Sequence, residues 1–395
     1  MIYMDNAASA PVDPDVFRAA QPFFMEQYGN PSSVHSMGRK AREAVEKARK
    51  QCAVALGCEP ENIFFTSGGT ESDNWAIQMH HEYLSQSVCT FTQILYNKIE
   101  HKAVLNCLDD DDLDYGVNVE TNGVLDFSKV KFILESNGKY SMKQDFTVVC
   151  MAANNELGTV QPIKSLSDLC YKHKVPFHCD AVQYIGKEPL DLKELKGITS
   201  LAISGHKIGG FKGSGLLYIR NPKADYVQPL IYGGGQEKGL RSGTENVPGI
   251  VALGAAMEKI THSDFDNTHV KEMHEYLQCA LSQIPAVHFN GDCEYQLPYY
   301  LNISFKGILG EALALALDRH GICVSTGSAC NTGSLTPSHV LTAIGLDSDY
   351  IDGTIRISLS ESNTLEECKT VAETIKEEVA KLRNVSPVWK GERVV

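Results

Sequence analysis

A lysine in a glycine-rich turn is the first residue of this sequence that could perform covalent chemistry. Lys207 ends the segment Ser-Gly-His-Lys at residues 204–207, which follows a short apolar run and precedes a pair of glycines. Backbone amides and hydroxyls in such a turn can hold a phosphate. A lysine amine sheltered from water can also form an imine with an aldehyde. The alternative is an ordinary surface lysine, and the segment alone does not exclude it.

An aspartate ends a second apolar run. Residues 175–179 read Val-Pro-Phe-His-Cys, and Asp180 follows them. A carboxylate there can pair with a protonated pyridine nitrogen and keep the ring an electron sink. A lysine for an aldehyde and a carboxylate for a ring nitrogen are what pyridoxal 5'-phosphate requires. Taken alone, Asp180 could equally form a turn or cap a helix.

A third segment offers an anion site. Residues 67–74, which follow a short apolar strand pattern at 62–66, include Gly69 and Thr70 and precede an apolar, helix-like stretch that starts at Trp75. Amides and a hydroxyl at a helix start favour a phosphate, because the helix dipole is positive there. The signal is weak by itself, since most glycine-rich turns bind no ligand.

The twelve cysteines are dispersed and include no C-x-x-C pair, so we expect reduced thiols that mostly pack as small apolar side chains. Cys330 differs because the residues around it, 325–334, are small and polar. A thiol in a water-accessible loop can ionise and move, whereas a thiol among apolar residues is inert. Cys323, in an apolar run, is expected to belong to the core.

These residues must be positioned by regular elements. Apolar periodicity predicts a helix over residues 38–56, with Gly57 as its left-handed stop. Short apolar runs predict strands at 62–66, 146–152, 175–179, 201–203 and 215–219, most of them separated by helix-length segments. Such alternation favours an α/β sheet with ligands at the strand ends.

The last third of the chain has a different pattern. It predicts an alternating strand at 299–305, a helix at 311–319, a strand at 354–359 and a long helix at 365–382 with a capping box. These elements indicate a second, α+β domain. The boundary is expected near residues 251–261, within a connecting helix.

Composition excludes several classes of function. The 395 residues carry 49 acidic and 36 basic side chains, a net charge of −13, which disfavours binding to nucleic acid or anionic lipid. No window approaches the roughly 18 apolar residues of a membrane helix, and the first residues lack the pattern of a signal peptide. We therefore expect a cytoplasmic protein that binds neither nucleic acid nor membrane.

Together these segments resemble the cysteine desulfurases of the NifS/IscS group, among the class V, fold-type I pyridoxal-phosphate enzymes. The resemblance covers almost the whole chain, and the motifs also agree in order and spacing. The matching stretches are residues 3–8, 29–35, 66–74, 100–101, 154–158, 180–183, 204–207 and 233–244.

The resemblance implies an α/β fold of the fold-type I transferases, with a mostly parallel mixed sheet flanked by helices in a large domain and a smaller α+β domain. We expect the large, cofactor-binding domain to span residues 13–260. The small domain would combine residues 1–12 and 261–395 and carry the Cys330 loop.

The resemblance also implies roles for individual residues. Lys207 would bond to the cofactor, with Asp180 at the ring nitrogen, Gln183 donating to the phenolate oxygen and His101 stacked on the ring. The phosphate would be held by Gly69, Thr70, Ser204, His206 and, from the partner subunit of a homodimer, Thr244.

The resemblance places Asn155 beside the cofactor and implies that Asn155 and Arg356 bind the substrate carboxylate. An arginine suits this task because its planar guanidinium group can donate two hydrogen bonds to one carboxylate. The alternative for Arg356 is an ordinary ion pair on an edge strand. No metal is expected.

The implied activity is removal of sulfur from L-cysteine, which gives L-alanine and a persulfide on Cys330. Lys207 would move the α-proton, and His101 would assist at the substrate thiol. The sulfur would pass to an acceptor protein such as an iron-sulfur scaffold. It would be used for iron-sulfur cluster assembly or for the synthesis of other thio-cofactors. One alternative is a selenocysteine lyase or another class V lyase or aminotransferase, which Cys330 disfavours. The other alternative is an inactive scaffold protein.

Overall fold

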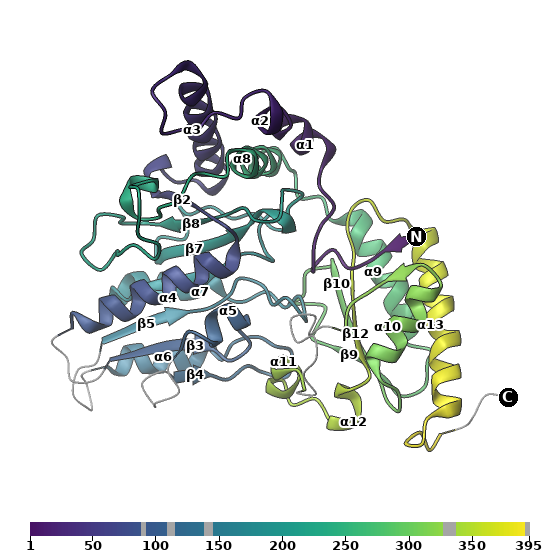
Figure 1. Cartoon of the computed structure of the whole chain (residues 1–395). Helices are drawn as coiled ribbons and strands as arrows, with labels where there is room; N and C mark the ends of the chain where they lie inside the picture. Colours follow the sequence, from purple (N-terminus) through teal and green to yellow (C-terminus); the bar gives the residue numbers. More distant parts are fainter. Residues whose placement is uncertain (88–91, 109–114, 138–144, 327–336, 392–395) are drawn as a thin grey trace.

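The structure is a computed structural model that describes residues 1–87, 92–108, 115–137, 145–326 and 337–391. A seven-stranded mixed sheet forms the larger part of the molecule, at the left of Figure 1. In spatial order its strands are β2 (Ile63–Thr66), β8 (Gly215–Ile219), β7 (Ile198–Ser204), β6 (Phe177–Asp180), β5 (Asp145–Val149), β3 (Thr92–Asn97) and β4 (Tyr115–Val117). Strand β8 is antiparallel to both of its neighbours, β2 and β7, and the other described strands of this sheet run in one direction.

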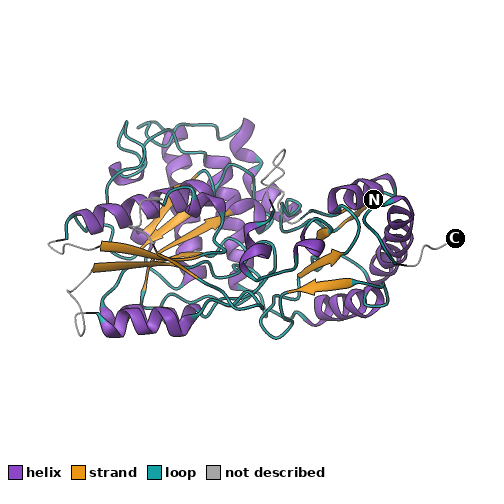
Figure 2. Cartoon of the chain, turned by 90° about the horizontal axis from the view of Figure 1, so that it is seen from below, coloured by secondary structure: helices purple, strands orange, loops and turns teal. Residues whose placement is uncertain are grey.

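Helices cover both faces of this sheet, as Figure 2 shows from below. One face packs against α3 (Ser36–Leu56), α6 (Phe127–Ser136), α7 (Ile163–His173) and α8 (Val247–Thr261), and the other against α4 (Gly69–Ser85) and α5 (Lys102–Leu105). In β2, Ile63 and Phe65 contact the first set, and Phe64 contacts Trp75 of α4. Burial on both faces explains why the strands are apolar runs without alternation.

Helix α3 shows how the local sequence specifies an element. The side chains at its helical spacing, Ala41, Val45, Ala48, Cys52 and Leu56, are buried in the main core. Gly57 ends the helix in the left-handed conformation, with φ of 67°. The predicted helix is therefore confirmed, and it begins two residues earlier than expected, at Ser36.

A smaller antiparallel sheet lies at the right of Figure 1 and has its own core. Its order is β12 (Thr354–Ser358), β10 (Tyr300–Phe305) and β9 (Val287–Asn290), and it packs with α9 (Thr268–Leu281), α10 (Gly310–Arg319) and α13 (Leu365–Val385). The first strand, β1 (Ile2–Tyr3), pairs with β11 (Ile322–Cys323), so the N-terminus lies beside the C-terminal third. The predicted domain boundaries stay a prediction.

The fold class predicted from the sequence is confirmed, with differences in individual elements. Helix α4 begins at Gly69 and not near Trp75, because its first two turns are polar and carry no apolar periodicity. Strands β3 and β4 were not predicted. The remaining helices are α1 (Pro14–Ala20), α2 (Pro22–Met25), α11 (His339–Ala343) and α12 (Ser348–Ile351). Among the described residues, no helix combines the length and apolar character needed to cross a bilayer.

Candidate active site

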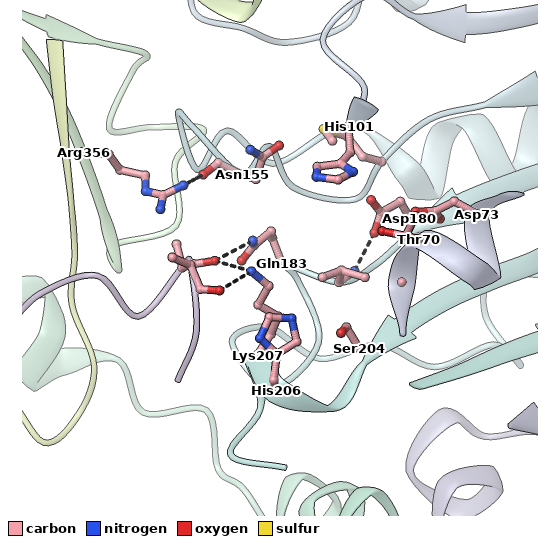
Figure 3. Close-up of a pocket in the computed structure, with 15 residues that line it drawn as sticks. Thr70, Asp73, His101, Asn155, Asp180, Gln183, Ser204, His206, Lys207 and Arg356 are labelled. Carbon is pink, nitrogen blue, oxygen red and sulfur yellow. Dashed lines mark hydrogen bonds between the residues drawn. The ribbon is translucent and has the colours of Figure 1, made fainter. Parts of the chain in front are cut away.

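A cavity of about 380 Å³ lies at the carboxyl edge of the larger sheet, where α/β proteins commonly bind ligands (Figure 3). Five of the parallel strands contribute residues at or after their carboxyl ends. They are Gly69, Thr70 and Asp73 after β2, His101 after β3, Met151 and Asn155 after β5, Asp180, Val182 and Gln183 at β6, and Ser204, His206 and Lys207 at β7. Ala7 and Ala8 of the N-terminal segment and Arg356 of β12 complete the lining.

The structure brings all but two of the predicted site residues to this cavity. Thr244 is exposed and is not among the residues of this chain that line the cavity. Cys330 lies outside the described residues. The roles that the resemblance implies for these two residues stay predictions.

Lys207 is presented by a short helical turn, Gly205–Lys207, that directly follows β7. The turn is tight, because a Cβ atom added at Gly205 would come within 2.7 Å of Ser214 Oγ. The Lys207 Nζ atom donates hydrogen bonds to the carbonyl oxygens of Ala7 at 2.7 Å and Ala8 at 2.8 Å. The N-terminal segment therefore holds the amine in the cavity.

Asp180 ends β6 and is buried. Its Oδ1 atom accepts a hydrogen bond from the Val182 amide at 2.8 Å. Burial, together with the negative charge of Asp73, raises the pKa of Asp180 to about 7. A carboxyl whose charge is disfavoured in this way is suited to a cationic partner in the cavity.

Asp73 is a cavity residue that the sequence analysis did not single out. It lies one turn after Gly69 on α4, a spacing that places both on one helix face and could have identified it. His178 Nε2 lies 3.2 Å from its Oδ1, and His178 Nδ1 lies 3.0 Å from Ser200 Oγ. Burial raises the pKa of Asp73 to about 7 and lowers that of His178 to about 4, so this imidazole is neutral at neutral pH.

His101 caps the N-terminus of α5, and this contact fixes its tautomer. Its Nδ1 atom accepts a hydrogen bond from the Ala103 amide at 3.1 Å. The proton of the neutral imidazole is therefore on Nε2. His101 and Lys207 lie on opposite sides of the cavity in the view of Figure 3.

Arg356 forms the ion pair that the sequence left open as the alternative, and it also lines the cavity. It lies on β12, an edge strand of the smaller sheet, and its Nη2 atom forms an ion pair with Asp5 Oδ1 at 2.9 Å. Its Nη1 atom donates to the Asn155 carbonyl oxygen at 2.6 Å. The guanidinium also lines the cavity, and it has five N–H donors, so these two bonds leave donors for a carboxylate. Nothing in the local sequence links Asp5 to Arg356.

Comparison with known proteins agrees with this geometry. The model of the family "Aminotransferase class-V" matches residues 2–371. The chain is 42% identical over 394 residues to the cysteine desulfurase IscS of Methanosarcina thermophila. The alignment covers 99% of this chain and 95% of the relative. The chain therefore belongs to the aminotransferase class-V family, whose enzymes use pyridoxal phosphate. Within that family its full-length relatives include cysteine desulfurases.

Solved structures show the same relationship. A NifS-like protein superposes with a TM-score of 0.86 at 38% identity, covering 96% of this chain and all of the other. A second structure, SspA in complex with cysteine, superposes with a TM-score of 0.76 at 34% identity and covers 91% of this chain and 99% of that one.

The cavity residues fit pyridoxal phosphate. The amine of Lys207 and the buried carboxyl of Asp180 face one cavity, as the aldehyde and the ring nitrogen require. Gly69 opens the N-terminus of α4 toward the cavity, where a Cβ atom would come within 2.8 Å of Val182 Cγ2. Burial, with the nearby charges of Lys207 and Lys212, lowers the pKa of His206 to about 4, so a neutral imidazole lies beside this anion site.

Proposed function

We propose that this protein is a pyridoxal-phosphate-dependent cysteine desulfurase that converts L-cysteine into L-alanine and transfers the sulfur atom to Cys330. One observation carries the proposal: Lys207, Asp180 and Arg356, from two different sheets, line a single cavity. Lys207 provides an amine for the cofactor aldehyde, Asp180 provides a carboxylate for its ring nitrogen, and Arg356 provides a guanidinium group for an amino-acid carboxylate. The full-length similarity to cysteine desulfurases supports this substrate.

Seven residues of the cavity hold the cofactor in this proposal. Lys207 bonds to it, Asp180 pairs with the ring nitrogen and Gln183 donates to the phenolate oxygen. The phosphate is held by Gly69, Thr70, Ser204 and His206. When bound, the cofactor withdraws electrons from the substrate Cα atom, which makes the Cα proton acidic.

The protein residues then bind the substrate and move protons. Arg356 and Asn155 hold the substrate carboxylate, which orients the Cα–H bond toward Lys207. The freed Lys207 amine takes the proton from Cα and returns it during formation of alanine. His101 carries its proton on Nε2, because Nδ1 accepts a hydrogen bond from the Ala103 amide, and Nε2 is the atom that exchanges this proton with the substrate thiol.

Sulfur transfer requires a nucleophile outside the described residues. The Cys330 thiolate attacks the substrate Sγ atom, so that an S–S bond forms while the Cβ–Sγ bond breaks. The electron pair of the broken bond stays with the carbon skeleton, which is protonated to alanine. The persulfide on Cys330 then passes its outer sulfur to an acceptor thiol. We propose that this acceptor is a protein such as an iron-sulfur scaffold, and that the enzyme is a cytoplasmic homodimer.

The test is alanine formation from L-cysteine by the purified holoenzyme. We expect Cys330→Ala to abolish alanine release while the cofactor absorption band is retained, because the thiol acts after the cofactor is bound. Cys293→Ala, which removes an exposed thiol away from the cavity, is the control and should keep full turnover. Unchanged turnover in Cys330→Ala would contradict the assignment. Release of alanine from selenocysteine but not from cysteine by the wild type would indicate a selenocysteine lyase instead.

A further inference from the structure

The amide of Gln183 is held between the two sheets of the molecule. Its Nε2 atom donates a hydrogen bond to the Ala7 carbonyl oxygen at 3.1 Å. Its Oε1 atom accepts a hydrogen bond from the Tyr300 hydroxyl at 2.5 Å. Gln183 follows β6 of the larger sheet, whereas Tyr300 begins β10 of the smaller one.

These two contacts allow only one orientation of the amide. A carbonyl oxygen can only accept, so the amide nitrogen must face Ala7 and the amide oxygen must face Tyr300. The hydroxyl then has to be the donor. Burial raises the pKa of Tyr300, which keeps the phenol protonated and able to donate.

Tyr300 is itself rigidly placed. It is wholly buried on the central strand of the smaller sheet. The loop after β5 passes so close that a Cβ atom added at Gly158 would lie 2.5 Å from Tyr300 Cβ, and Gly158 has a φ of +76°. The hydroxyl therefore cannot move away from Gln183 without disturbing this packing.

We propose that Tyr300 is a positioning residue for the cofactor: by donating its hydroxyl proton to Gln183 Oε1, it fixes the amide so that the second N–H of Nε2 is available to a ligand oxygen in the cavity. A primary amide has two N–H donors, and Ala7 takes only one of them. The inference rests on the proposed function, in which that ligand oxygen is the phenolate of pyridoxal phosphate. The smaller sheet thereby orients a cofactor-binding group that belongs to the larger one.

The experiment measures pyridoxal phosphate binding to apoprotein, by absorbance and by the dissociation constant. Tyr300→Phe removes the hydroxyl and keeps the ring. We expect about 2- to 10-fold weaker binding, the effect of one lost hydrogen bond. We also expect a shifted absorption band of the bound cofactor, because its phenolate loses an oriented donor.

Tyr299→Phe is the matched control. Tyr299 is the neighbouring buried tyrosine, and its hydroxyl also donates to an amide oxygen, Asn267 Oδ1, at 2.7 Å. Asn267 does not line the cavity. We expect this variant to bind the cofactor with the affinity and spectrum of the wild type. Equal weakening by both variants would show a general packing effect and overturn the proposal.

A double-mutant cycle tests whether Tyr300 acts through Gln183. In a Gln183→Ala background, Tyr300→Phe should cause no further loss of affinity, because the group that it orients is absent. Additive losses, or wild-type binding and absorption by Tyr300→Phe alone, would overturn the inference while leaving the proposed function intact. Failure of the wild-type apoprotein to bind pyridoxal phosphate would overturn the proposed function, and the inference with it.

Discussion

Two buried carboxyl groups, Asp73 and Asp180, line the cavity. Burial raises the pKa of each to about 7, and the charge of Asp73 contributes to the shift at Asp180. The two negative charges disfavour each other, and a cation placed beside them favours the ionised form. In the proposed function, the cofactor's ring nitrogen is that cation, and Asp180 is the partner that faces it.

This arrangement predicts a pH-dependent effect of Asp73→Asn on the stability of the apoprotein. An unfolded Asp has a pKa of about 3.9, whereas folded Asp73 titrates near 7, so between these values the folded protein holds more protons. The stabilisation present below about pH 4 is therefore lost as pH rises toward 7. The Asp73→Asn variant lacks this loss of stability. It also lowers the pKa of Asp180, because the negative charge of Asp73 is removed. Its stability relative to the wild type should rise across this window.

The measurement is urea unfolding of the wild type and of Asp73→Asn from pH 4 to pH 8. Using the difference between the two proteins cancels the opposite contribution of His206, whose pKa burial lowers to about 4. A difference in the free energy of unfolding that does not change with pH would contradict the account of this pair.

At the scale of elements, the sequence predicted best what depends on local pattern. Strands β6 and β7 are apolar because both faces of the sheet are covered, and the polar residues that end them, Asp180 and Ser204, lie at the site. Strand β3 escaped prediction because Gln93 and Asn97 interrupt its apolar run. The start of α4 escaped because its first turns are polar, and Gly69, Thr70 and Asp73 of these turns line the cavity.

Contacts between elements could not be predicted in the same way. Tyr300 and Gln183 are 117 residues apart, and Arg356 and Asp5 are 351 residues apart. Each pair forms only because the smaller sheet and the N-terminal segment meet the carboxyl edge of the larger sheet. Residue spacing carries no signal for such a meeting, so the contacts of Tyr300 with Gln183 and of Arg356 with Asp5 could not be predicted.

At the scale of the whole molecule, the proposed homodimer makes each site depend on both chains. The segment that carries Thr244 is anchored by two ion pairs, the partly buried pair of Arg241 with Glu71 at 2.7 Å and the buried pair of Glu237 with Arg49 at 2.7 Å. Glu71 Oε2 also accepts a hydrogen bond from the Ser67 amide in the turn before Gly69. The segment is thus fixed to the body of its own subunit while Thr244 is exposed.

This arrangement predicts complementation between two defective chains. Lys207→Ala is expected to be inactive, and Thr244→Ala to bind the cofactor phosphate poorly. In a mixed dimer, one site combines an intact Lys207 with the intact Thr244 of the other chain, so co-expression should restore alanine formation. Activity of the mixture no higher than that of either variant alone would contradict a contribution of Thr244 across subunits.

The most direct test of the central claim is the mass of the Cys330 peptide after the holoenzyme has reacted with L-cysteine in the absence of an acceptor. The account predicts that this peptide gains the mass of one sulfur atom, that the gain disappears on reduction with a thiol, and that alanine is released in equal amount. Release of alanine with no sulfur on Cys330, or sulfur bound at another cysteine, would contradict it.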